Sequence, residues 1–174
     1  KCIVQYWIPS SEYPEPTYNN LLQARDQKSL VEVSTKSFEQ YANKYGHDFK
    51  RIDKKKINFR HPTFERFDLW LDDSLWEEYD EIMYVDCDVF AMPNAPDIFQ
   101  SYKSLDTFKV CDHPAFQMAT KPEQINHIYH GLLKECKLED VKNYGFQPGV
   151  FILTKPARDI MRPYIEKFKE LNDH

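Results

Sequence analysis

Two aspartates separated by one residue, Asp86 and Asp88, are the side chains of this sequence best placed to bind a cation. They directly follow a predicted strand at 81–85, and in an extended chain residues i and i+2 project to the same side. Two carboxylates facing one point repel each other unless a cation, a proton or a donor neutralises them. Oxygen ligands select Mg²⁺ or Mn²⁺, and such an ion keeps positions that phosphate oxygens can fill. The pair therefore indicates a metal–diphosphate site, and the simpler interpretation that it only caps a strand–loop junction stays open.

Alternating strands and helices must position this pair. Apolar, β-branched and aromatic runs predict strands at 2–8, 81–85, 108–111 and 149–154, and the segment 48–52 after Gly46 is predicted as a further strand. Apolar periodicity predicts helices at 21–45, 63–78 and 122–134, and a last helix that begins at Pro156. Continuous apolar strands alternating with helices are typical of a mostly parallel sheet, so we expect a three-layer α/β/α fold. Ligands bind such folds beyond the carboxyl ends of the strands, where Asp86 and Asp88 lie.

The same periodicity predicts which side of each helix is buried. In the first helix the predicted inner residues are Leu30, Val33, Phe38, Tyr41, Ala42 and Tyr45, with Gly46 as the stop. In the second helix they are Phe64, Phe67, Leu71 and Leu75, and in the last helix Ile160, Tyr164, Ile165, Phe168 and Leu171.

Composition and charge exclude several classes of protein. The 174 residues carry a formal net charge of −5, which argues against a nucleic-acid binder, although a basic run lies within 50–56. We interpret that run as a solvated strand end and loop rather than as an anion site. No run approaches the length of a membrane span. The cysteines form no zinc or disulfide pattern, so we expect a cytoplasmic or cytosol-facing protein; they are Cys2, Cys87, Cys111 and Cys136.

The residues around the aspartates resemble a known family. The stretch Tyr79–Phe90, YDEIMYVDCDVF, is similar to the "yDxilyxDxDv" segment of GT-A-fold glycosyltransferases, especially families 8 and 34. Ser37–Asp48 resembles their "nYaxxhGYd" segment, and Pro62–Arg66 resembles their "PxWxK" or "yxR" segment. Phe146–Leu153 resembles "FNxGVxxxN", and Lys109–His113 resembles the strand that leads to the acceptor side. The chain is also similar in size to capsid-glycosylating enzymes of large algal viruses, which would place it in the host cytoplasm.

This resemblance implies an activity and a role for each matching residue. It implies metal-dependent transfer of a sugar from a nucleotide diphosphate, with uridine as the base, to a glycan or protein-linked glycan acceptor. Asp86 and Asp88 would hold Mn²⁺ or Mg²⁺ on the donor, and Arg66 would approach the donor nucleotide-sugar. Gln147, which stands where the family often has Asn, and Asp112 would orient the transferred sugar. The end of the first strand, Gln5, Tyr6 and Trp7, would contact the base.

The sequence departs from the family in two places. No histidine is securely placed to complete the metal site, because His174 is the last residue. Relatives also continue into a "DQxxLN" segment after the helix that ends near Leu171. We therefore expect residues 1–174 to be one GT-A-like domain, and three alternatives stay open for its C-terminus: a fragment, a donor half, or an unusually short member of the family.

Three other functions remain to be weighed. A haloacid-dehalogenase-type phosphatase also uses two aspartates after a buried strand, but that family carries them on its first strand. A sugar-phosphate nucleotidyltransferase would need a glycine-rich loop after the first strand, and no glycine precedes Gly46. A non-catalytic module that binds a nucleotide-sugar or glycan is the third alternative; the two retained aspartates argue against it and the missing C-terminal segment argues for it.

Overall fold

The computed structural model describes residues 1–9, 27–57, 62–101, 109–112 and 146–172. The chain divides into two compact units, 1–109 with 149–174, and 110–148. Most of β4 (Lys109–Asp112) and the first three residues of β5 (Phe146–Thr154) belong to the second unit. The helix predicted at 122–134 lies outside the described residues, and the prediction of a single domain over 1–174 stays a prediction.

The sheet of the first unit brings three strand ends to one edge. Its strands lie in the order β2 (Asp48–Ile52), β1 (Cys2–Tyr6), β3 (Glu81–Val85) and β5. β1 is parallel to both of its neighbours, whereas β5 is antiparallel to β3 with Val85 opposite Val150. The carboxyl ends of β1, β2 and β3 therefore meet at one edge, and the segment around Gly149 returns to that same edge.

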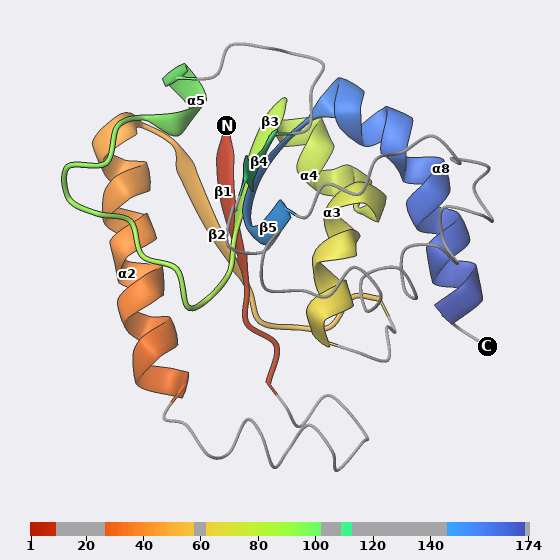
Figure 1. The fold of residues 1–174 in the computed structure, drawn as a ribbon, viewed down its shortest axis with the longest axis horizontal. Helices are drawn as coiled ribbons and strands as arrows, with labels where there is room; N and C mark the ends of the chain where they lie inside the picture. Colours follow the sequence, from red (N-terminus) through yellow and green to blue (C-terminus); the bar gives the residue numbers. More distant parts are fainter. Residues whose placement is uncertain (10–26, 58–61, 102–108, 113–145, 173–174) are drawn as a thin grey trace. The chain divides into compact units, whose positions relative to one another are not determined.

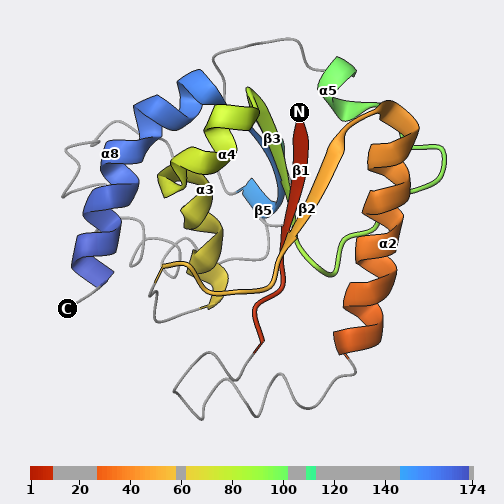
Figure 2. The same ribbon diagram turned by 180° about the vertical axis from the view of Figure 1, so that it is seen from behind.

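Alternate residues of each strand enter two separate cores. One core joins Cys2, Val4, Ile82, Tyr84, Phe151 and Leu153 to three helices, α3 (Asp68–Leu71), α4 (Asp73–Glu78) and α8 (Lys155–Asn172). The other joins Ile3, Met83, Val85 and Ile152 to α2 (Gln27–Tyr45) and α5 (Ile98–Ser101). Figures 1 and 2 show α2 on one face of the sheet and α3, α4 and α8 on the other. The predicted three-layer fold with a mostly parallel sheet is confirmed.

The buried face of α2 is more polar than predicted. Phe38, Tyr41 and Ala42 are buried as expected, but Leu30 and Val33 are 41% and 59% exposed. Neighbouring positions are buried instead. They include Ser34 and Thr35, whose hydroxyl groups hydrogen-bond to Gln5 of β1. The prediction relied on apolar periodicity alone, so it chose the wrong buried side for the N-terminal half of this helix.

The end of α2 follows the predicted stop. Gly46 has a φ of 69°, in the left-handed region, and the His47 N–H donates to the carbonyl of Ala42 at 3.0 Å. A glycine adopts this conformation without the steric cost that a Cβ imposes. The turn leads directly into β2.

The helix predicted at 63–78 is broken into three pieces. A 3-10 helix (η2, Pro62–Phe67) is followed by α3 and α4, which are separated by Asp72. Asp72 has an extended backbone, and its carboxylate accepts from the Ser74 N–H at 3.0 Å. This is an N-cap, so Asp72 ends one helix and starts the next. The single-helix prediction is wrong because it followed the apolar period through a capping sequence.

The last helix packs through part of the predicted face, since Ile165 is buried and Phe168 is half-buried against Phe64 and Phe67, but three other predicted residues are exposed. Ala157, Arg158 and Ile165 are buried, whereas Ile160 and Tyr164 are 66% and 44% exposed. Leu171 is 47% exposed as well.

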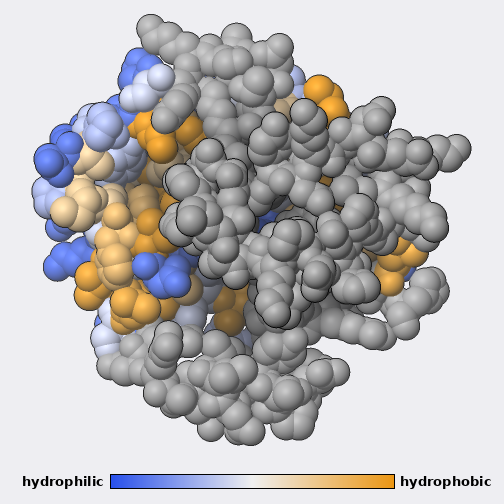
Figure 3. All heavy atoms as spheres, in the orientation of Figure 1, coloured by the Kyte–Doolittle hydropathy of each residue, from blue (hydrophilic) through white to orange (hydrophobic). Residues whose placement is uncertain are grey.

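Hydrophobic and hydrophilic residues both reach the described surface, where Figure 3 shows them interspersed. None of the described helices is long and apolar enough to cross a membrane.

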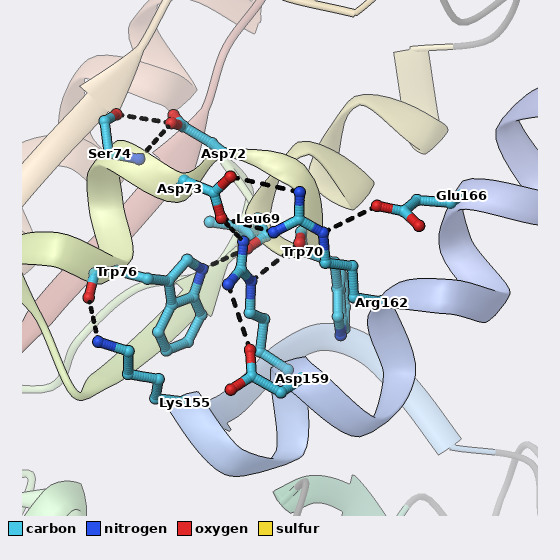
Figure 4. Close-up of polar contacts among 11 residues, drawn as sticks. Leu69, Trp70, Asp72, Asp73, Ser74, Trp76, Lys155, Asp159, Arg162 and Glu166 are labelled. Carbon is cyan, nitrogen blue, oxygen red and sulfur yellow. Dashed lines mark hydrogen bonds and ion pairs between the residues drawn. The ribbon is translucent and has the colours of Figure 1, made fainter.

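A network of charges joins α8 to α3 and α4. Arg158 is 5% exposed; its Nε donates to the Trp70 carbonyl at 2.9 Å, and its guanidinium also bonds to Asp73. Arg162 donates to Asp73 at 2.5 Å and to Glu166 at 2.8 Å, as Figure 4 shows. α8 therefore turns two arginines toward α4, and hydrogen bonds offset the cost of burying the Arg158 charge.

Candidate active site

Asp86 and Asp88 lie in a turn rather than on one extended strand. β3 ends at Val85, and the Val89 N–H donates to the Asp86 carbonyl at 3.3 Å, which closes a β-turn over 86–89. Asp86 is half-buried and Asp88 is exposed. The reasoning from i, i+2 projection along an extended chain is therefore wrong. Burial raises the pKa of Asp86, and the negative charge of Asp88 acts in the same direction.

Asp86 is held through its carboxylate by a neighbour on β3 and through its backbone by one on β5. The Tyr84 hydroxyl donates to Asp86 Oδ1, and the Asp86 N–H donates to the Gly149 carbonyl at 2.7 Å. Burial raises the pKa of Asp86, while the Tyr84 hydrogen bond and the positive charge of Arg66 act in the opposite direction. Asp86 is thus a fixed, partly desolvated carboxylate at the carboxyl edge of the sheet.

Gln5 connects β1, α2 and the aspartate turn. Its side chain is fully buried, and its amide donates to Ser34 Oγ at 2.9 Å and to the Asp86 carbonyl at 3.3 Å. Its Oε1 accepts from Thr35 Oγ1 at 2.7 Å. The Gln5 amide therefore holds the turn from inside the protein, and contact of Gln5 with the base stays a prediction.

Tyr6 and Trp7 continue from β1 toward the same edge. The Tyr6 hydroxyl donates to Asp68 Oδ2 at 3.1 Å, and burial raises the pKa of Tyr6 well above its usual range. Its polar group is therefore engaged inside the protein rather than offered to a ligand. The Trp7 N–H donates to the Ile52 carbonyl at 2.8 Å, and its side chain is half-buried. Contact of either residue with the base stays a prediction.

The structure brings Arg66 to the aspartates. Arg66 lies in η2, and its Cζ is 5.7 Å from the centre of the Tyr84 ring. Its charge lowers the pKa of Asp86, which places the guanidinium within electrostatic reach of that carboxylate. A cation beside the site suits a diphosphate ligand. Of Gln147 and Asp112, in β5 and β4, the structure describes the backbone but not the side chains.

The basic run within 50–56 is largely neutralised by carboxylates. Lys50 pairs with Glu78 at 2.6 Å, and Lys55 lies 3.8 Å from Glu65. Lys56 pairs with Asp72. These pairs give the lysines structural partners, in agreement with the interpretation that the run is not an anion site.

Sequence reasoning missed the side chains that fix the segment after Asp88. Ser34 Oγ donates to the Val89 carbonyl at 2.5 Å, and Ser37 Oγ accepts from the Ala91 N–H at 3.0 Å. Further along, Tyr41 and Tyr45 donate to the carbonyls of Pro96 and Ala95. The available signal was polar residues recurring on the sheet-facing side of α2. The sequence does not indicate which groups these polar residues bind, because their partners lie in and after the turn that follows β3.

Asp86 and Asp88 carry the oxygen ligands that hard divalent cations prefer. Among the described residues, no group of three or more His, Cys, Asp and Glu side chains could hold a metal ion. Gly149 leaves space for Asp86 Oδ2, since a Cβ at that position would lie 2.9 Å from this oxygen. Two carboxylates with other positions left to water and phosphate are the usual pattern for Mg²⁺ at nucleotides.

Comparisons with known proteins identify the fold. No family model matches the chain, and no curated protein matches it. The crystal structure of a glycosyltransferase involved in glycosylating the major capsid of PBCV-1 aligns over 100% of this chain and 68% of its own, with a TM-score of 0.55 and 14% identity. The galactosyltransferase LgtC, solved with donor and acceptor sugar analogues, aligns over 98% and 66%, with a TM-score of 0.49 and 14% identity. The first likeness shows that this chain has the GT-A fold.

Proposed function

We propose that this chain is a metal-dependent glycosyltransferase that moves a sugar from a nucleotide diphosphate, a UDP-sugar, to a glycan or protein-linked glycan. One observation carries the proposal: a half-buried Asp86, held by hydrogen bonds and accompanied by Asp88, lies at the ligand-binding edge of a GT-A sheet. The fold favours glycosyl transfer over the phosphatase alternative.

In this proposal Asp86 and Asp88 would hold Mn²⁺ or Mg²⁺, and a bound cation would supply positive charge to the donor diphosphate. Arg66 adds a second positive charge beside the same group. Gln147 and Asp112 orient the sugar for attack by the acceptor hydroxyl on the anomeric carbon. The bond to the diphosphate oxygen breaks, the diphosphate leaves, and the hydroxyl proton passes to solvent.

The acceptor and the compartment belong to the same proposal. The structural neighbour that acts in capsid glycosylation supports a glycoprotein or glycan acceptor. Among the described residues, Cys2 and Cys87 are both free thiols, which supports the cytoplasmic or cytosol-facing location expected from the sequence.

Release of UDP from UDP-sugars tests the proposal and separates catalysis from mere binding. We expect release in Mn²⁺, and none in EDTA or in Asp88→Asn. Asp80→Asn is the matched control, because Asp80 is also exposed and lies at the opposite end of β3. UDP release that is equal in EDTA would refute metal dependence. Metal-dependent binding without release, across several UDP-sugars and glycan acceptors, would identify a non-catalytic module instead.

A further inference from the structure

Gly149 occupies a position where the side chain of any other residue would meet Asp86. Its carbonyl accepts a hydrogen bond from the Asp86 N–H at 2.7 Å, which keeps the two backbones in direct contact. A Cβ at Gly149 would lie 2.9 Å from Asp86 Oδ2, closer than real Cβ contacts allow. Among the described glycines, Gly46 has a positive φ and Gly149 does not, so the backbone of Gly149 lies outside the left-handed region. The backbone therefore does not require glycine here, and the neighbouring carboxylate does.

Tyr84 restrains the opposite oxygen of the same carboxylate. Its hydroxyl donates to Asp86 Oδ1, and its ring is 5% exposed. The ring stacks on Phe151 of β5 with centroids 4.8 Å apart and an interplanar angle of 23°. One oxygen of Asp86 is thus tied to a ring that cannot easily move. The other occupies the space that a missing side chain leaves.

We propose that Gly149 and Tyr84 are positioning residues, which together fix the orientation of the Asp86 carboxylate for a divalent cation; this inference rests on the proposed function. Partners that orient a metal-binding carboxylate affect affinity because the ligand must otherwise be ordered on binding. With alanine at position 149, the Asp86 Cγ and Cβ would remain at ordinary contact distances of 3.6 and 3.8 Å. Only the tip of the carboxylate must move, so the fold is preserved while the metal ligand is misdirected.

Calorimetric titration of Mn²⁺ in the presence of UDP tests the inference, with urea unfolding of each variant measured in parallel. We expect Gly149→Ala and Tyr84→Phe each to weaken Mn²⁺ binding by about 10- to 100-fold. The double variant should lose less than the product of the two factors, because both changes free the same carboxylate. Gly46→Ala is the control. Its φ of 69° penalises alanine, but no atom lies within 4 Å of the added Cβ, so stability falls and Mn²⁺ affinity does not.

The outcomes separate this inference from the function on which it rests. If the wild type binds Mn²⁺, Asp88→Asn abolishes binding, and both Gly149→Ala and Tyr84→Phe bind like the wild type, the positioning roles are refuted and the proposed function stands. If the wild type does not bind Mn²⁺ with UDP, both are refuted. A Gly149→Ala protein that fails to fold would show that the clash is not confined to the carboxylate tip, and the single variant Tyr84→Phe would then decide whether its hydroxyl positions Asp86.

Discussion

Replacing Gln5 with leucine tests whether this residue is a structural anchor rather than a nucleotide ligand. Leucine has a similar volume and keeps the apolar contacts of a fully buried side chain, but it removes three hydrogen bonds. Each such bond contributes about 0.5–1.5 kcal/mol net. The Thr35 hydroxyl, on a residue that is 8% exposed, also loses its acceptor. We therefore expect Gln5→Leu to lower the free energy of unfolding by about 2–4 kcal/mol.

Urea unfolding followed by fluorescence of the three tryptophans measures this change. Gln40→Leu is the matched control, since Gln40 lies on the exposed side of α2 and the same substitution there should change stability by less than about 0.5 kcal/mol. Adding Thr35→Val to Gln5→Leu should recover part of the loss, because both partners of one hydrogen bond are then apolar. If Gln5→Leu unfolds at the same urea concentration as the wild type, the anchoring role is refuted.

Three more predictions follow from the cores and the charges. Leu153→Ala should cost about 2–5 kcal/mol in urea unfolding, because Leu153 is fully buried; a cost below about 1 kcal/mol would contradict the core assignment. The arginines lower the pKa of Asp73 from 3.8 to about 2, so its stabilising contribution is complete above pH 3.8 and is lost as the pH falls toward about 2. The free energy of unfolding of Asp73→Asn, measured against pH, should therefore lack this acid-dependent loss. If it changes with pH in parallel with that of the wild type, the pairing is refuted. Arg66→Met should weaken UDP binding in titrations at low salt more than at high salt. Equal UDP affinities of the variant and the wild type would refute a role for Arg66 in donor binding.

Local signals in the sequence were sufficient for most elements of the first unit. The strands predicted at 48–52 and 81–85 have these bounds in the structure, and the second ends where its apolar run meets Asp86. Gly46 was recognisable as a helix stop because only glycine readily adopts its conformation. The order of elements along the chain was enough for the three-layer fold. The antiparallel direction of β5 was not predictable in this way, because an apolar strand carries no mark of its direction.

The candidate site was predictable in its residues but not in its geometry. Asp86 and Asp88 were found from their spacing, yet the turn that holds them depends on Ser34 and Gln5, which lie far from it in sequence. At Gln5, a polar residue at a strand end suggested a ligand contact, whereas its hydrogen-bond partners on α2 become visible only in three dimensions. Arg158 shows the same limit, since apolar periodicity gives no sign that a charged residue of this helix is buried and pairs with α4.

Titration of UDP into the protein with Mn²⁺ and with EDTA tests the central claim most directly. If Asp86 and Asp88 bind the diphosphate through a divalent cation, UDP should bind in Mn²⁺, lose that binding in EDTA, and fail to bind the double variant Asp86→Asn/Asp88→Asn in either buffer. UDP that binds with the same affinity in EDTA, or that binds the double variant as it binds the wild type, would contradict the account.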